Sequence, residues 1–191
     1  MGLDDVAAAL GEGAVAIIPT DTVYGVAAAP ERATILFELK RRPIEKALPV
    51  LGADLAQLRR VAELGDVALD LAARAWPGPL TLVVPRAAGF TADLGGTDDG
   101  TVAVRIPDHP TTLDLLRRTG PLAVTSANIS GGRPATTCTA ARGLWPGTAC
   151  LDGGTCDGRP STIVGLVGEP RVLREGALRA DEVLSWVQGP T

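Results

Sequence analysis

Apolar positions along the chain follow two different periods, and Gly or Pro residues separate the segments. Short continuous apolar runs are typical of buried strands, whereas apolar positions three and four residues apart are typical of amphipathic helices. Strands are predicted over 14–18, 48–51, 80–84, 102–106, 122–125, 149–151, 162–167 and 171–174. Helices are predicted over 3–10, 31–41, 55–61, 67–76, 112–118, 137–144 and 181–187. This mixed order predicts an α/β or α+β fold with one sheet.

The length and the apolar content predict a single domain over residues 1–191. A chain of 191 residues, of which 46% are apolar, can build a core without disulfide bonds or metals. No apolar stretch approaches the roughly 20 residues that cross a bilayer, and no basic segment precedes the first apolar run. We therefore expect a cytoplasmic protein with no membrane partner.

The cysteines and the histidine argue against two kinds of chemistry. Cys138, Cys150 and Cys156 are too few and too widely spaced for a disulfide framework, and with His109 they match no metal-ligand spacing. We expect buried free thiols in a reducing cytosol, and no metal site on the protein. A serine hydrolase is also disfavoured, because Ser126 lacks the G-x-S-x-G elbow.

The charge pattern is the most informative part of the composition. A net charge of −4 disfavours a general nucleic-acid binder, which usually carries a basic domain. Yet the only two lysines of the chain, Lys40 and Lys46, lie within seven residues of each other, and every other cation is arginine. Lysine acts on phosphate as a compact point charge, so the cluster indicates an anion site. The alternative is a solvated helix end that the helix dipole favours.

Two common nucleotide motifs, G-x-x-x-x-G-K-[ST] and G-x-G-x-x-G, do not occur in the chain, so any phosphate site uses another geometry. The glycine pair 131–132, after Asn128, forms either a small anion-binding nest or an ordinary turn. Residues 19–25 follow a predicted strand, where ligand-binding loops gather. Tyr24 in that segment is either a substrate wall or a core-edge tyrosine. The Gly- and Asp-rich segment 87–100 is long enough for a lid or a mobile hairpin.

Six short motifs occur in a recognisable order. They are Pro19-Thr20-Asp21-Thr22-Val23-Tyr24-Gly25, Lys40-x-Arg42-Pro43 with Lys46, Arg105-x-Pro107-x-His109, Ser126-Ala127-Asn128-x-Ser130-Gly131, Pro160-Ser161-Thr162-Ile163-Val164 and Arg174-Glu175-Gly176. Over about residues 10–176 the chain resembles the YrdC-type threonylcarbamoyl-adenylate synthases. The resemblance implies a twisted mixed sheet flanked by helices around a large basic cavity. It also implies an enzyme that joins L-threonine, bicarbonate or CO2, and ATP into threonylcarbamoyl-AMP, with release of pyrophosphate.

The resemblance and the chemistry together suggest a role for each matching residue. Anions that repel each other in water must meet, so cations and N–H donors are needed more than a strong nucleophile. The candidates for the triphosphate are Lys40, Arg42, Lys46 and Arg174, and the first three are expected to act in catalysis. By resemblance, the residues that contact the nucleotide or the reacting carbamate are Ser126, Asn128 and Thr136. The residues implied for L-threonine are Thr22 and Ser161, with Arg105 on its carboxylate and His109 in support.

The resemblance extends to cofactors and partners. Mg²⁺ is expected to bridge phosphate oxygens of ATP, and the product is expected to supply the threonylcarbamoyl transferase machinery that modifies adenosine 37 of tRNA. Two positions depart from the family pattern: segment 48–52 lacks a histidine that some relatives carry, and Ala47 replaces a common proline. The first departure leaves one substrate contact unassigned.

Two other functions stay open at this point. One is a double-stranded RNA-binding module of the same fold, with weak RNA binding that falls steeply with salt. The other is carbamoyl-adenylate chemistry in hydrogenase maturation. It ranks last, because no acylphosphatase-like or zinc-finger segment accompanies the motifs.

Overall fold

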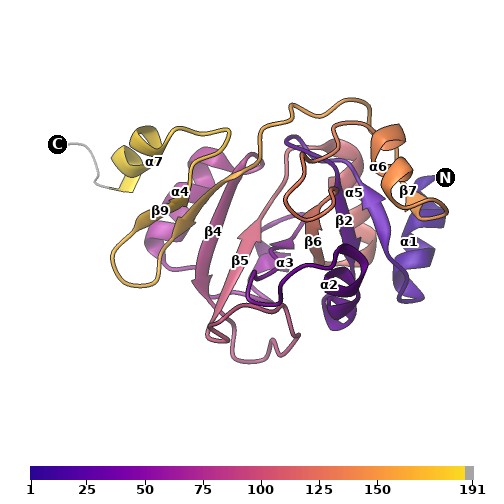
Figure 1. Cartoon of the computed structure of the whole chain (residues 1–191). Helices are drawn as coiled ribbons and strands as arrows, with labels where there is room; N and C mark the ends of the chain where they lie inside the picture. The colour runs from indigo at the N-terminus through magenta and orange to yellow at the C-terminus, as the bar shows by residue number, and fades with distance from the viewer. Residues whose placement is uncertain (188–191) are drawn as a thin grey trace.

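A nine-stranded mixed sheet forms the frame of the molecule in the computed structural model, which describes residues 1–187. The strands lie in the order β7-β1-β2-β6-β3-β5-β4-β8-β9 (Figure 1). Neighbours β1 and β7, β3 and β5, and β4 and β8 run parallel, and the other neighbours run antiparallel. The strands are β1 Ala16–Ile18, β2 Gly25–Ala28, β3 Val50–Leu51, β4 Leu80–Pro85, β5 Thr101–Arg105, β6 Leu122–Ser126, β7 Ala149–Cys150, β8 Thr162–Gly165 and β9 Arg171–Arg174.

Helices pack against this sheet and against one another. They are α1 Leu3–Gly11, the 3-10 helix η1 Pro30–Arg32, α2 Thr34–Lys40, α3 Leu55–Leu58, α4 Asp66–Ala75, α5 Pro110–Thr119, α6 Cys138–Leu144 and α7 Ala180–Val187. Helix α1 packs on α5, α2 on β2, α4 on α7 and β4, and α6 on β1. In Figure 1 the N-terminal helix lies at one end of the sheet, and β9 and α7 lie at the other.

The core consists of two apolar clusters. In β1, Ile17 belongs to the larger cluster, whereas Ala16 and Ile18 belong to the smaller one, as the two-residue period of a strand requires. The smaller cluster takes apolar residues of α1 and α5, and the larger takes those of α2, α4, α6 and α7. The sheet is therefore covered by helices on both faces.

Backbone hydrogen bonds join loops that are far apart in sequence. The Ala127 N–H donates to the Tyr24 carbonyl (2.7 Å), and the Tyr24 N–H donates to the Ala135 carbonyl (2.9 Å). The Gly158 N–H donates to the carbonyl of Thr22 (2.7 Å). These bonds hold the loops that follow β1, β6 and β7 side by side, and these loops carry several of the motif residues.

The predicted fold class, a mixed α/β sheet with flanking helices, is confirmed. One prediction was incomplete: strand β2 was not predicted, because its sequence Gly-Val-Ala-Ala has no run of large apolar residues. The strand is nevertheless central, between β1 and β6. A Cβ on Gly25 would lie 2.5 Å from Cγ1 of Val124, so a small residue is required there.

Several boundaries also differ from the prediction. The predicted helix 31–41 is split into η1 and α2 and ends at Lys40, because Arg41 adopts a left-handed conformation with φ 49°. The predicted helix 55–61 ends with α3 at Leu58, and the predicted strand 162–167 ends with β8 at Gly165.

The expectation of three separate thiols is wrong for two cysteines. The structure pairs Cys138, at the start of α6, with Cys150 in β7 as a disulfide, with Cα atoms 6.4 Å apart. That separation lies within the usual disulfide range of about 4.4–6.8 Å, and it arises because α6 packs beside β1, the neighbour of β7. Cys156 is a buried free thiol whose pKa is raised by burial.

A membrane-crossing helix, which needs about 20 apolar residues, is not found among the described residues.

Candidate active site

A cavity of about 440 Å³ lies over the sheet, where β6, β5, β4 and β8 approach the loop after β1. Its apolar lining comes from strands, for example Val83, Ala103 and Val124. Its polar lining is made of hydroxyls and guanidinium groups, from Thr20, Thr22, Arg42, Thr81, Arg105, Thr125, Ser126, Ser161 and Arg174. No Asp or Glu appears among the lining residues of the described chain. The cavity is therefore suited to anions.

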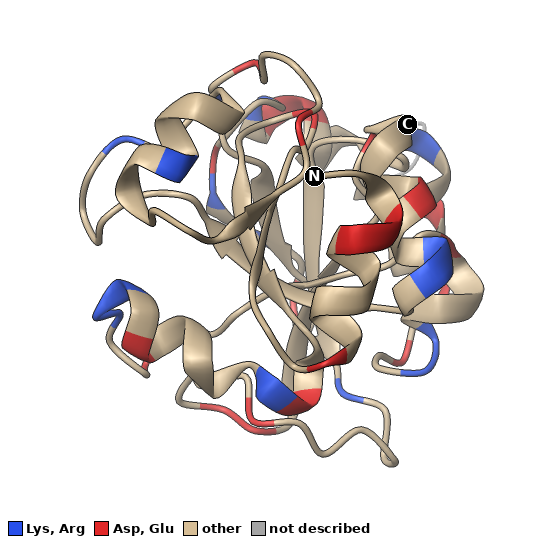
Figure 2. Ribbon diagram, turned by 90° about the vertical axis from the view of Figure 1, so that its right-hand side faces the viewer, with Lys and Arg blue, Asp and Glu red and all other residues tan. Residues whose placement is uncertain are grey.

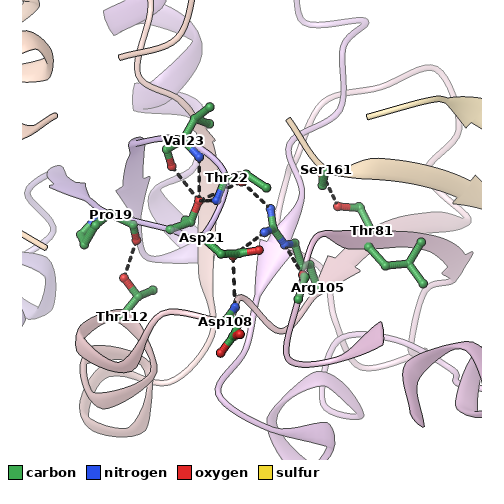
Figure 3. Close-up of polar contacts among 12 residues, drawn as sticks. Pro19, Asp21, Thr22, Val23, Thr81, Arg105, Asp108, Thr112 and Ser161 are labelled. Carbon is green, nitrogen blue, oxygen red and sulfur yellow. Dashed lines mark hydrogen bonds and ion pairs between the residues drawn. The ribbon is translucent and has the colours of Figure 1, made fainter. Parts of the chain in front are cut away.

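The loop after β1 is fixed by its own hydroxyl groups. Thr20 Oγ1 donates to the Val23 carbonyl (2.6 Å) and accepts the N–H groups of Thr22 (3.2 Å) and Val23 (3.1 Å). These bonds close a tight turn and hold Thr22 Oγ1 within 2.9 Å of Thr20 Oγ1. Thr22, a predicted threonine contact, therefore faces Arg105 from a rigid loop (Figure 3).

Arg105, at the end of β5, is buried, with 5% of its surface exposed. Its guanidinium donates to Asp21 Oδ1 (2.5 Å), Thr22 Oγ1 (3.0 Å) and the Gly78 carbonyl (2.8 Å), as Figure 3 shows in part. Burial lowers the pKa of Arg105, and the carboxylate of Asp21 opposes that effect. A guanidinium has five N–H donors, so two remain for a ligand.

A second polar group joins β4, β8 and β9. Thr81 Oγ1 and Ser161 Oγ lie 2.8 Å apart (Figure 3), because β4 and β8 are parallel neighbours. Arg174 of β9 donates through Nη2 to the Ser161 carbonyl (2.7 Å) and Oγ (3.3 Å). The pKa of Arg174 is lowered first by burial and then by the charge of Arg105. Ser161 and Arg174, both predicted site residues, are thus in contact.

Arg42 reaches the cavity from the loop after α2. Its Nε donates to the Lys46 carbonyl (3.0 Å) and its Nη2 to the Ala47 carbonyl (3.2 Å). Burial and then the charge of Arg174 lower its pKa. Arg42, Arg105 and Arg174 thus line one cavity although they come from three distant segments. Because these three cations repel one another, the cavity favours binding of an anion.

Lys40 lies behind this cavity, with 3% of its surface exposed. Its Nζ contacts Thr125 Oγ1 (3.0 Å), the Ser126 carbonyl (2.5 Å) and Asn128 Oδ1 (2.9 Å). Burial, and then the charge of Arg42, lower its pKa to about 8. This placement differs from the expectation that Lys40 itself reaches the triphosphate.

Four other predicted residues do not line the cavity. Lys46 is exposed, and its carbonyl holds Arg42. Asn128 is buried behind Ser126, whose Oγ lies 2.7 Å from Asn128 Oδ1. Thr136 is half-buried, and its carbonyl accepts the Cys156 N–H. His109 Nε2 lies 3.2 Å from the Gly153 carbonyl, so His109 supports the loop after β7.

Sequence reasoning did not single out Thr20, Asp21, Thr81 and Thr125. The position of Asp21 within the Pro19–Gly25 motif was a usable signal, because a buried arginine needs a carboxylate partner. Thr81 and Thr125 lie inside apolar strands and gave no signal. Tyr24 is fully buried, and its hydroxyl donates to the Gly154 carbonyl (2.8 Å), so the core interpretation of this residue holds.

A protein-held Mg²⁺ does not fit these residues. Mg²⁺ in nucleotide sites is usually held by substrate phosphates together with one or two carboxylates. Asp21 is the acidic group at the edge of the cavity, and its Oδ1 accepts both Arg105 and the Asp108 N–H. Within residues 1–187 no cluster of three or more His, Cys, Asp or Glu side chains is placed to hold a metal.

The fold and the cavity define an α/β protein with an arginine-lined hollow over the face of a mixed sheet. The chain belongs to the Sua5/YciO/YrdC family, whose model, described as "Telomere recombination", matches residues 8–176. The family resemblance inferred from the six motifs is therefore confirmed.

The relatives have a consistent description. A threonylcarbamoyl-AMP synthase of Escherichia coli is 37% identical over 186 residues, which cover 91% of this chain and 96% of its own length. One of Pseudomonas aeruginosa is 44% identical over 128 residues, or 65% of this chain and 68% of its own. Sua5 of Pyrococcus abyssi, solved with L-threonine, is 35% identical with a TM-score of 0.91 over 98% of this chain. This chain covers 57% of the length of that archaeal protein.

Proposed function

We propose that this chain is a threonylcarbamoyl-AMP synthase, an enzyme that uses L-threonine and ATP. The observation that carries the proposal is the convergence of Arg42, Arg105 and Arg174 on one cavity whose lining has no acidic side chain. The curated relatives carry the same activity in their names. Bicarbonate or CO2 supplies the carbon of the carbamate.

The reaction joins two anions. The threonine amine combines with bicarbonate to give a carbamate and water. A carbamate oxygen then forms a bond to the α-phosphorus of ATP, the bond from that phosphorus to the β-phosphate oxygen breaks, and pyrophosphate leaves. Both reactants of the second step, the carbamate and ATP, are negatively charged, so positioning and positive charge are the main contributions that the protein can make.

The threonine end of the site is built around Arg105. Its two remaining N–H donors suit a carboxylate, and Thr22 and Ser161 add hydroxyls on either side. Asp21 orients the guanidinium from behind. The geometry assigns no general base, and the carbamate needs none once it has formed.

The triphosphate end is built around Arg42 and Arg174, which line the cavity, and the exposed Lys46 is a further candidate cation on the loop that holds Arg42. Charge builds on the leaving pyrophosphate as the α-phosphorus bond breaks, and guanidinium groups stabilise it. Ser126 lines the same cavity, and we assign it to the nucleotide side together with Asn128, which lies behind it, and Thr136. Mg²⁺ would enter with the ATP substrate and would lower the charge that the arginines must neutralise.

The product is a mixed anhydride, which has to be passed on to an acceptor. The proposed acceptor system is the threonylcarbamoyl transferase machinery that acts on tRNA in the cytoplasm. Direct RNA binding has less support than this catalytic role, because it would need a predominantly basic surface. Acidic and basic positions are interspersed on the side of the molecule that Figure 2 shows.

Incubation of the purified protein with ATP, Mg²⁺, bicarbonate and L-threonine tests the proposal. Mass spectrometry should detect threonylcarbamoyl-AMP, with one pyrophosphate released per product. Omitting L-threonine, or replacing it with L-valine, should abolish or strongly reduce the product, because L-valine lacks the hydroxyl. ATP hydrolysis that does not depend on the amino acid would contradict the proposal.

A further inference from the structure

Lys40 is a buried cation whose ammonium faces the chain itself rather than the cavity. It is the last residue of α2, and it reaches across to the end of β6. Its three nearest acceptors are Thr125 Oγ1 at 3.0 Å, the Ser126 carbonyl at 2.5 Å and Asn128 Oδ1 at 2.9 Å. An ammonium has three N–H donors and no acceptor. The chain offers a fourth, longer contact, to Ser126 Oγ at 3.5 Å, so all three donors are used by the chain and none is left to bind a phosphate.

The ammonium fixes the orientation of the neighbouring amide. Because Lys40 can only donate, the side-chain oxygen of Asn128 must face it, and the amide nitrogen then donates to the Gly132 carbonyl at 2.6 Å. The Ser126 hydroxyl lies 2.7 Å from the same Asn128 oxygen. That oxygen can only accept, so the single hydroxyl proton of Ser126 points at Asn128.

This arrangement determines which hydrogen bonds Ser126 can make with a ligand in the cavity. Ser126 lines the cavity, and its only proton is already committed to Asn128. Its oxygen can therefore only accept a hydrogen bond from a ligand. A phosphate or carboxylate oxygen cannot supply one, whereas a ribose hydroxyl or the N–H of a carbamate can.

We propose that Lys40 is a positioning residue: from behind β6 it fixes Ser126 as a hydrogen-bond acceptor that receives an O–H or N–H of the bound substrates. The proposal rests on the proposed function for the identity of those substrates. It separates Lys40 from Arg42 and Arg174, which line the cavity.

Steady-state kinetics of Lys40→Met and Thr125→Val test this role. A positioning residue affects the transition state more than ground-state binding. Lys40→Met should therefore lower kcat by about 100-fold, the cost of a misplacement of about 1 Å, while KM for ATP stays near the wild-type value. Thr125→Val removes one acceptor and should lower kcat less. Thr119→Val, which removes a threonine hydroxyl that bonds within α5, is the matched control and should retain wild-type kinetics.

The two lysines allow a second measurement that does not depend on activity. Carbon-13 labelling of the lysine ε-carbons gives two signals, one from Lys40 and one from the exposed Lys46. Because Thr125 accepts a charge-assisted hydrogen bond, Thr125→Val should move the titration of the Lys40 signal to lower pH by about one pH unit. The Lys46 signal should not move.

Each result has a defined meaning. A raised KM for ATP with unchanged kcat in Lys40→Met would make Lys40 a phosphate ligand and overturn the proposal. A folded variant with wild-type kcat would reduce Lys40 to a structural role and also overturn it. If Lys40→Met does not fold, Thr125→Val tests the proposal instead. An unchanged kcat together with an unchanged titration of the Lys40 carbon-13 signal in that variant refutes the proposal. A wild-type protein that makes no threonylcarbamoyl-AMP refutes the proposed function, and the Lys40 signal still tests the contact.

Discussion

Substitution of Arg174 by alanine is the sharpest single perturbation of the proposed phosphate site. Arg174 lies on β9, at the end of the sheet, and its guanidinium lines the cavity beside Ser161. Burial, and then the charge of Arg105, lower its pKa, so the cation is held close to another cation. We expect Arg174→Ala to remove one charge-assisted contact to the triphosphate and to relieve this repulsion.

The size of the effect follows from the contact that is lost. A hydrogen bond to a charged group contributes about 1.5–3 kcal/mol, which corresponds to a loss of about 10- to 150-fold in kcat/KM for ATP. Stability should change little, because within residues 1–187 the Arg174 side chain donates only to Ser161, and the substitution relieves repulsion from Arg105.

Pyrophosphate release gives kcat/KM for ATP, and thermal melting of the same preparations gives the change in stability. Arg171→Ala is the matched control, because Arg171 lies on the same strand, is exposed and does not line the cavity. The control should keep wild-type kinetics and melting temperature. If Arg174→Ala has a wild-type rate and a lowered melting temperature, Arg174 is structural and the phosphate site is wrongly placed.

Three further predictions follow from the geometry. Asp21→Asn leaves the Arg105 charge buried without its carboxylate, which should cost about 3–5 kcal/mol and lower the melting temperature by about 6–20 °C; an unchanged melting temperature would contradict this. Gly153→Ala places a Cβ 2.5 Å from His109 Cε1 and should lower the free energy of unfolding, measured by urea titration, by about 1–3 kcal/mol, whereas Gly89→Ala, with open space around it, should not. Because burial lowers the pKa of Lys40 to about 8, below its ordinary value of 10.5, the unfolded chain binds more protons between these values. The free energy of unfolding of the wild type, compared with Lys40→Met, should therefore rise across that pH window by on the order of 1–3 kcal/mol in urea melts.

Much of the fold could be predicted because the chain alternates strongly between strand-like and helix-like apolar periods. Strands such as β4 and β6 were predicted nearly at their observed bounds, because buried strands carry continuous apolar runs. Strand β2 was not predicted, because its position depends on the close approach of Gly25 to Val124. That is a tertiary contact which leaves no periodic signal in a four-residue segment of small side chains.

The candidate site was predictable for residues that belong to short sequence motifs. Thr22, Arg105 and Ser161 share the cavity because the loop after β1, the end of β5 and the start of β8 meet at one face of the sheet. The direction in which a side chain points was not predictable. Lys40 and Arg42 are two residues apart, yet Lys40 ends α2 and faces β6, whereas Arg42 follows the left-handed turn at Arg41 and faces the cavity. Only the backbone turn separates these two roles.

The most direct test of the central claim is the dissociation constant of the wild-type protein for AMP, ADP and ATP, measured by calorimetry in the same buffer. If Arg42 and Arg174 hold the β- and γ-phosphates, affinity should rise in steps from AMP to ADP to ATP, by about 10-fold or more for each added phosphate. The rise should be smaller in Arg174→Ala. Equal affinities for the three nucleotides would show that the arginine-lined cavity does not bind the triphosphate, and would contradict the account.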